Sequence, residues 1–277
     1  MRSLVARARI VAHRGAESAA KEDLLVTEEP LEIRLGHGPT DDRREVRLSV
    51  TMRTPGNDEE LSRGFLFTEG IIHDPAEIVR IVPCENVKEE ERGNVVRAEL
   101  DPTVQLDPSR WQRNFYTTSS CGVCGKTSLD AVHAQCTREM EPFGPVDGEV
   151  IASLPEKMRA AQTVFEHTGG IHAAALFDRE GHLLILREDI GRHNAVDKVI
   201  GALLQLELST TGLQLLVSGR AGFELVQKCV MTGIPLMAAV GAPSSIAVEL
   251  AQQHGLSLIG FLRGDRFNMY SPIDPNP

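Results

Sequence analysis

The N-terminal third of the chain alternates polar and apolar residues in short runs, a pattern typical of half-buried β-strands. Residues 45–53 (EVRLSVTMR) show this alternation clearly, and residues 78–82 and 94–100 predict two further strands. The acidic run between those two, residues 85–91, is expected to form a solvated hairpin tip. A helix is predicted after the first strand, with Asn57 and Asp58 as capping residues ahead of Leu61, Phe65 and Leu66.

The C-terminal half follows a different pattern, in which strand-like and helix-like runs alternate. Helical spacing covers residues 155–167, with Pro155 near the start and a Gly-Gly pair after the end. Two strand-like runs around a turn at residues 178–181 predict a hairpin. The later elements are expected at residues 194–206 (helix), 213–217 (strand), 223–231 (helix), 235–240 (strand), 246–253 (helix) and 256–261 (strand). Because helices separate these strands, parallel crossovers are implied, and this half is predicted to be a layered α/β domain with a mixed sheet.

Breaker-rich stretches suggest where the chain divides. A loop-rich stretch at 101–120 contains Pro102 and Pro108, and Pro and Gly residues gather at 141–148, so a boundary is expected between about residues 115 and 148. We therefore expect a flexible N-terminal tail (1–25), a smaller strand-rich α+β domain ending with a Cys-x-x-Cys loop (26–140), and the α/β domain (141–277). The first sixteen residues lack the apolar block of a signal peptide, and the most apolar window, 234–248, is too short and interrupted to cross a bilayer. A cytoplasmic protein without membrane insertion is expected.

Composition narrows the classes of function. Apolar residues make up 42% of the chain and charged residues 25%, which is sufficient for a packed core. Lys and Arg number 29 against 39 Asp and Glu, a net charge of −10, which argues against a nucleic-acid-binding surface. The five cysteines are odd in number and include one Cys-x-x-Cys pair, unlike a secreted disulfide framework.

A ligand-binding edge is predicted for the α/β domain. Open α/β sheets bind ligands beyond the carboxyl ends of their strands. Three such ends are expected at residues 218–222 (SGRAG), 241–245 (GAPSS) and 263–266 (RGDR). The first two lead into helices whose free N–H groups hold phosphate, and Arg220, Arg263 and Arg266 add donors. A nucleotide or phosphate site is therefore indicated, with tight βα turns as the alternative explanation of the small residues.

A second polar cluster lies between a predicted strand and a predicted helix. It covers residues 187–194 (REDIGRHN) and is followed by Asp197 and Lys198. Asp189 is in a position to cap the helix. For His193 the sequence leaves two readings open, a packed hydrogen-bonded histidine or a functional one.

The Cys-x-x-Cys pair, Cys121 and Cys124, carries the sharpest chemical signal. A zinc site needs four ligands, but the other cysteines are isolated at positions 84, 136 and 229 and no H-x-x-x-H occurs. A zinc deaminase needs H-x-E or C-x-E followed by P-C-x-x-C, and both parts are missing. A redox dithiol of the thioredoxin kind is another possible explanation, although that motif lies early in its fold and this pair lies mid-chain. A sulfur carrier needs an exposed thiol of lowered pKa, which Gly122, Gly125 and Lys126 would favour.

Six blocks of residues, in order, resemble the FdhD/NarQ family of formate dehydrogenase accessory proteins, sulfur carriers for the molybdenum cofactor. The blocks are residues 64–72 (GFLFTEGII), 121–125 (CGVCG), 168–175 (TGGIHAAA), 188–198 (EDIGRHNAVDK), 218–220 (SGR) and 260–266 (GFLRGDR). The resemblance implies a cytidine-deaminase-like C-terminal domain beside the smaller N-terminal domain. It also implies a homodimer and no tightly held metal of the protein's own.

The resemblance further implies a function. Persulfide sulfur would pass from a cysteine desulfurase to the molybdenum bis(guanine dinucleotide) cofactor before that cofactor enters formate dehydrogenase. Cys121 would carry the sulfur and Cys124 would assist. The residues implied in contact with the cofactor are Phe261, Leu262, Arg263, Gly264, Asp265 and Arg266. The alternative is a chaperone that binds the cofactor without handling sulfur.

Overall fold

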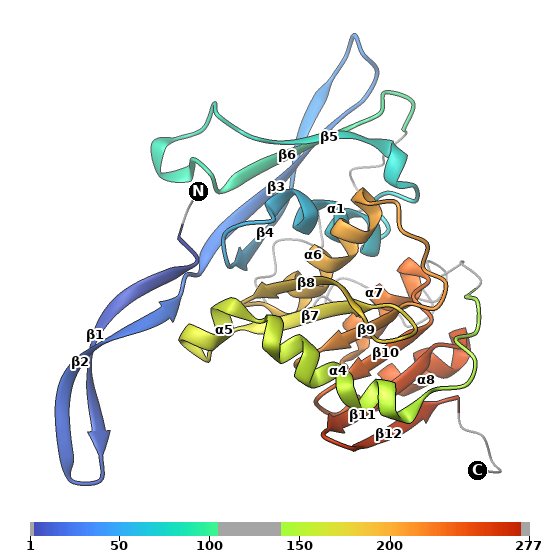
Figure 1. The fold of residues 1–277 in the computed structure, drawn as a ribbon. Coiled ribbons are helices and arrows are strands. Elements are labelled where there is room, and N and C mark those ends of the chain that lie inside the picture. Colours follow the sequence, from blue (N-terminus) through green and yellow to red (C-terminus); the bar gives the residue numbers. More distant parts are fainter. Residues whose placement is uncertain (1–2, 105–139, 273–277) are drawn as a thin grey trace.

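The computed structural model describes residues 3–104 and 140–272, which form three β-sheets and the helices packed on them (Figure 1). Cys121, Cys124 and Cys136 lie outside the described residues.

The largest sheet has six strands and belongs to the C-terminal half. Its strands are β7 (His172–Phe177), β8 (Leu183–Asp189), β9 (Gln214–Val217), β10 (Leu236–Ala239), β11 (Ser257–Arg263) and β12 (Arg266–Ser271), in the order β12-β11-β10-β9-β7-β8. β9, β10 and β11 pair in parallel, as the alternation of strands and helices predicted. β7 is antiparallel to both β8 and β9, so β8 points the same way as β9. The carboxyl ends of β8, β9, β10 and β11 therefore meet at one edge of the sheet.

Helices cover both faces of this sheet (Figure 1). One face packs against α6 (Arg192–Gln205), α7 (Phe223–Thr232) and α8 (Ser245–His254), and the other packs against α4 (Gly148–Ala161). Every residue of β9 and β10 is buried, as expected of central strands covered on both sides. These three layers confirm the α/β class predicted for this half.

The second sheet belongs to the N-terminal half. Its strands are β3 (Glu29–His37), β4 (Arg44–Arg53), β5 (Ile78–Pro83) and β6 (Val95–Leu100), in the order β4-β3-β6-β5. β5 and β6 are the predicted hairpin. The acidic run in their connection contains the short 3-10 helix η2 (Glu89–Glu91), and another 3-10 helix, η1 (Pro75–Glu77), precedes β5. Helix α1 (Asp58–Thr68) packs one face on this sheet and another on α6, so it joins the two halves.

The N-terminal tail that we expected at residues 1–25 is, over its described part, a β-hairpin. Strands β1 (Val5–Arg14) and β2 (Glu17–Val26) pair along their whole length and project from the body of the molecule (Figure 1). A two-residue turn joins them, and Gly15 takes a φ of 64° there, a conformation that suits glycine. The arginines of β1 divide its apolar residues into runs of one to three.

Two predicted boundaries and one predicted helix cap are corrected. The helix expected at 155–167 is α4, which begins at Gly148 where the Asp147 carboxylate accepts hydrogen bonds from the first turn, followed by α5 (Thr163–Thr168), so Pro155 lies inside a helix. The last strand does not end at residue 261 but runs to Arg263 and returns as β12. Asn57 precedes α1 in a left-handed conformation and its side chain makes no capping bond.

Candidate functional site

The loops that follow β9, β10 and β11 form one continuous rim at the carboxyl edge of the six-stranded sheet. The Ala221 N–H donates to the Ala242 carbonyl (3.1 Å), and the Gly241 N–H donates to the Gly219 carbonyl (2.9 Å). The Phe261 N–H in turn donates to the Gly241 carbonyl (3.0 Å). Backbone bonds therefore fix the three segments to one another, and the three strand ends that the sequence predicted to converge do so.

Glycines allow the close approach of these loops. A Cβ atom at Gly260 would lie 2.7 Å from Cδ of Pro243, and one at Gly241 would lie 3.0 Å from Cα of Arg220. By contrast, a Cβ atom at Gly222, just before α7, would meet nothing within 4 Å. The rim is thus tightly packed along its base and open above the start of α7.

The hairpin between β11 and β12 carries the six residues implied in cofactor contact. Leu262 is fully buried in the core beneath α4, so its side chain faces away from solvent. Phe261 is 45% exposed and has a φ of 55°, which is unusual for a residue with a side chain. Gly264 makes the turn with a φ of 56°. The side chains of Arg263, Asp265 and Arg266 are exposed, as is that of Arg220 in the neighbouring loop.

Most of the polar cluster at residues 187–198 joins the two halves of the protein. The carboxylate of Asp189 is fully buried and lies 2.7 Å from Nζ of Lys198. It also accepts from the backbone N–H of Thr54 (3.1 Å) and from Nδ2 of Asn194 (3.0 Å). Asn194 donates in addition to the Met52 carbonyl (2.8 Å). Asp189, predicted as a possible cap, is therefore the centre of a buried network between β4 and α6.

A second buried network lies deeper on the same interface. Nζ of Lys228 is 3.0 Å from carboxylate oxygens of both Asp197 and Glu69, and it donates to the Thr68 hydroxyl (2.8 Å). Burial alone would lower the pKa of Lys228, but the two carboxylates outweigh it and raise that pKa. Lys228 is therefore held as a cation between α1, α6 and α7.

Arg187 and Glu188, two further members of the cluster, also make structural contacts. Arg187 binds the N-terminal half, and Glu188 caps a helix. Nε of Arg187 donates to Glu60 of α1 (2.5 Å), and this hydrogen bond raises the pKa of Arg187. The Glu188 carboxylate accepts from the backbone N–H groups of Val164 and Phe165 at the start of α5 (2.9 Å each). These side chains are committed to structure and are not free to bind a ligand.

Histidines occupy the remaining part of the carboxyl edge. Nε2 of His193, in the first turn of α6, lies 2.5 Å from a carboxylate oxygen of Glu224 in the first turn of α7. His172, the first residue of β7, lies over Gly219, where a Cβ would be 3.6 Å from its Nδ1. Burial lowers the pKa of His172 below the usual 6.5, and the charges of Arg192 and His193 lower it further. Glu224 has no local sequence signal as a partner of His193, because it lies 31 positions further along the chain.

The two cysteines in the described residues are poor nucleophiles. Cys229 is completely buried, and burial raises the pKa of its thiol far above the usual range. Burial also raises the pKa of Cys84, which is partly exposed. Neither thiol therefore has the lowered pKa that a sulfur carrier needs.

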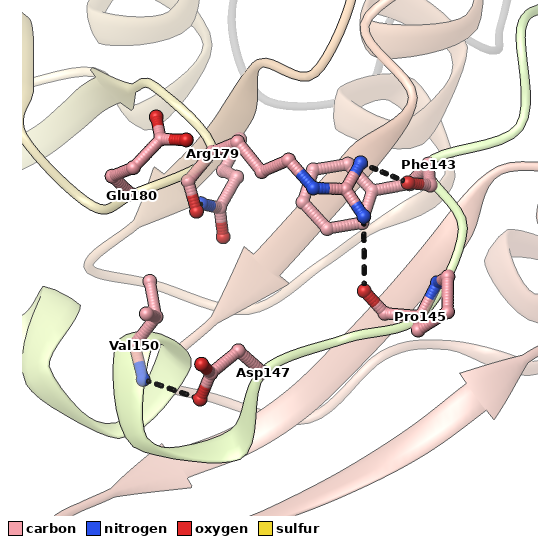
Figure 2. Close-up of a pocket in the computed structure, with 7 residues that line it drawn as sticks. Phe143, Pro145, Asp147, Val150, Arg179 and Glu180 are labelled. Atoms are coloured by element: carbon pink, nitrogen blue, oxygen red, sulfur yellow. Dashed lines mark hydrogen bonds between the residues drawn. The ribbon is translucent and has the colours of Figure 1, made fainter.

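A cavity of about 220 Å³ lies at the opposite edge of the sheet (Figure 2). Two of its polar side chains, those of Arg179 and Asp147, hold the segment before α4 and its first turn. Arg179 donates to the Phe143 and Pro145 carbonyls (2.6 and 3.3 Å), and the Asp147 carboxylate accepts from the Val150 N–H (3.3 Å). These hydrogen bonds are structural, and the cavity is separate from the carboxyl edge.

Comparison with known proteins places the chain in a family. The model of the FdhD/NarQ family matches residues 26–274. This chain belongs to the FdhD/NarQ family. It is 50% identical over 272 residues to a protein of Streptomyces avermitilis (96% of this chain, 93% of the relative), and 46% identical over 275 residues to one of Mycobacterium tuberculosis (96% of each). A third relative, from Thermoplasma volcanium, is 43% identical over 251 residues (90% of this chain, 88% of the relative). All three carry the name "Sulfur carrier protein FdhD".

The fold also has a match among solved structures. A crystal structure described as that of a candidate formate dehydrogenase accessory protein from Desulfotalea psychrophila superposes with a TM-score of 0.73. The match covers 99% of both chains at 24% sequence identity. The arrangement of sheets and helices is therefore shared along essentially the whole length.

The blocks that carry the FdhD/NarQ resemblance divide into two groups in the structure. Residues 64–72 and most of 188–198 form the interface between α1 and α6. The blocks at 218–220 and 260–266 and His172 lie on the carboxyl edge. The block at 121–125 lies outside the described residues. Among the residues that the structure describes, no helix is long and apolar enough to span a membrane.

Proposed function

We propose that this FdhD/NarQ protein is a sulfur carrier required for formate dehydrogenase activity. It takes persulfide sulfur from a cysteine desulfurase and transfers it to the molybdenum bis(guanine dinucleotide) cofactor before that cofactor is inserted into formate dehydrogenase. The observation that carries the proposal is the near full-length similarity to relatives named as sulfur carriers, at identities up to 50%.

The first step is a thiol exchange on Cys121. The thiolate of Cys121 attacks the outer sulfur of the desulfurase persulfide, and a new S–S bond forms as the bond between the two donor sulfurs breaks. The donor cysteine leaves as a thiolate, so the step involves no net oxidation. The raised pKa values of Cys84 and Cys229 support the choice of Cys121, with Cys124 assisting, because neither of these two described thiols readily forms a thiolate.

The carboxyl edge is the proposed contact surface for the cofactor, which is the substrate of the carrier. Arg220, Arg263 and Arg266 are exposed there and supply planar donors for a pyrophosphate. The open space above Gly222 lies at the start of α7, where the helix dipole favours an anion. Leu262 would contribute through its backbone alone, because its side chain is in the core. The protein is further proposed to act in the cytoplasm as a homodimer.

Activation of a molybdenum-dependent formate dehydrogenase tests this function. Cells that lack the protein are supplied with the native chain or with Cys121→Ala, Cys124→Ala or Cys84→Ala. We expect Cys121→Ala to abolish activation, Cys124→Ala to lower it less, and Cys84→Ala to match the native chain. Full activation by Cys121→Ala would refute the proposal.

A chaperone that binds the cofactor without handling sulfur is the second candidate. The carboxyl edge favours it as much as it favours a carrier, since both must hold the cofactor. Only the carrier requires sulfur to become attached to Cys121, so the two functions are separated by detection of that adduct.

A further inference from the structure

The β1–β2 hairpin (residues 5–26) has no role in the proposed function. The match to the FdhD/NarQ family begins at residue 26, so almost all of the hairpin precedes it. None of the residues in its two strands is buried. The hairpin projects from the body of the molecule, and β2 contacts α5 (Figure 1). It therefore needs another explanation.

Contact with a second surface would stabilise the hairpin. A two-stranded hairpin alone is at best marginally stable in water. This one pairs over ten positions, so it extends about 33 Å. The side chains of Val11 and Leu25 are 60% and 50% exposed along it. A surface that covers the hairpin would remove this apolar area from water.

Charge indicates the kind of surface that β1 fits. This strand carries Arg7, Arg9 and Arg14, which are all exposed, and it has no acidic residue. Arg7 lies 3.6 Å from Glu22 of β2, but both side chains are largely exposed, so this ion pair contributes little. Within the described parts of the chain, Arg9 and Arg14 form no ion pair. β1 is therefore complementary to an acidic surface.

The acidic connection between β5 and β6 (residues 85–91) is such a surface. Glu85, Glu89 and Glu90 are exposed there, and none of the three forms an ion pair with a residue that the structure describes. The turn of the β1–β2 hairpin lies far from this connection in the same molecule (Figure 1). Each molecule thus presents both sides of an ionic contact that a second copy can complete. The net charge of −10 makes a second copy a better fit than a nucleic acid.

We propose that two copies of this chain exchange hairpins, so that β1 of each copy lies against the acidic connection of the other. The same two surfaces then meet twice, which is the arrangement of a two-fold symmetric dimer. The inference rests on the proposed homodimer, to which it assigns a contact surface. It does not depend on sulfur transfer.

Sedimentation equilibrium of charge-reversed chains tests the exchange through the dissociation constant of the dimer. The hairpin set is Arg7→Glu, Arg9→Glu and Arg14→Glu, and the connection set is Glu85→Lys, Glu89→Lys and Glu90→Lys. Either set alone should raise the dissociation constant about tenfold or more, because like charges then face one another. A chain that carries both sets has the native net charge and restores opposite charges across the contact. It should dimerise nearly as well as the native chain.

A matched control separates local contact from net charge. The control set is Glu156→Lys, Glu180→Lys and Glu249→Lys, three exposed positions of the C-terminal half. It changes the net charge by the same amount as the connection set does. Added to the hairpin set, it should leave the dimer weak. Rescue by the connection set would also show that the hairpin set does not unfold the chain.

Hydrogen exchange of the native chain gives a second measurement that needs no variant. The amides of residues 5–14 should exchange more slowly at a protein concentration where the dimer predominates than at one where the monomer does. Equal exchange at the two concentrations would overturn the inference, because a covered hairpin is protected.

The remaining outcomes also decide the matter. An unchanged dissociation constant with the hairpin set, or equal rescue by the control set, would overturn the exchange. A hairpin set that dimerises normally but no longer takes sulfur from a cysteine desulfurase would overturn it too, and would assign the hairpin to that enzyme. A native chain that stays monomeric would refute both the exchange and the homodimer. Sulfur loading of Cys121 in the same preparation decides the carrier function separately.

Discussion

Gly64 of α1 lies directly against the backbone carbonyl of Asp197 in α6, and a Cβ atom at Gly64 would be only 1.9 Å from that oxygen. A second glycine acts in the same way from the other helix, since a Cβ at Gly201 would lie 1.8 Å from the Glu60 carbonyl. The two helices therefore cross backbone to backbone. This contact brings the N-terminal half against the helix that leads away from the carboxyl edge.

Substitution of Gly64 by alanine should separate the two helices. Because the new methyl group meets backbone rather than a mobile side chain, we expect Gly64→Ala to lower the free energy of unfolding by at least about 2 kcal/mol. Urea unfolding followed by circular dichroism measures this. Gly170→Ala is the control, because its Cβ would meet nothing closer than 3.7 Å. Equal stabilities of the two variants would contradict the close crossing.

The Asp197–Lys228 pair predicts a strong coupling between buried charges. Lys228→Met leaves the Asp197 and Glu69 carboxylates without their cation, and we expect a loss of about 3–5 kcal/mol in the free energy of unfolding. The double variant Asp197→Leu, Lys228→Met should lose much less than the sum of the two single variants. Additive losses would show that the pair does not act as a unit.

His172 predicts a loss of stability in acid. Its pKa is lowered below 6.5 in the folded protein, so the unfolded chain takes up a proton first as the pH falls. The contribution of His172 is therefore fully present above pH 6.5 and decreases below it. Urea unfolding at a series of pH values should show a shallower acid limb for His172→Gln than for the native chain. Identical limbs would contradict the lowered pKa.

Cysteine accessibility gives a further prediction. Iodoacetamide at neutral pH should leave Cys229 unmodified in the folded protein, because the thiol is fully buried and its pKa is raised. Peptide mass spectrometry before and after unfolding in urea measures the difference at this site. Rapid labelling of Cys229 in the native state would show that α7 opens readily.

The order of strands and helices in the C-terminal half was predictable because local patterns encode it. Short apolar runs such as residues 236–239 and the amphipathic helices between them carry their periodicity in neighbouring residues. The β1–β2 hairpin was not predicted, because the arginines of β1 leave apolar runs of one to three residues, which carry little strand signal. Asp147 marked the N-cap of α4, yet Pro155 drew the predicted start seven residues past the true first residue, Gly148.

The candidate site was predictable only in part for a related reason. Strand ends identify the carboxyl edge, because parallel connections bring them together whatever the side chains are. Pairing between distant side chains has no local signal. The sequence therefore left His193 undecided and passed over Glu224, its partner from the next helix. In the same way, the hydrogen bond that the Thr54 N–H donates to Asp189 and the one that Arg187 donates to Glu60 depend on how the two halves pack.

Sulfur transfer through Cys121 is the central claim, and mass spectrometry of the protein after incubation with a cysteine desulfurase and cysteine tests it most directly. Peptide mapping of the native chain should find one additional sulfur atom on Cys121, removable by a reducing thiol and missing from Cys121→Ala. Cys84 and Cys229 should carry none. A native protein that gains no sulfur on Cys121 under conditions where the desulfurase forms its own persulfide would contradict the account.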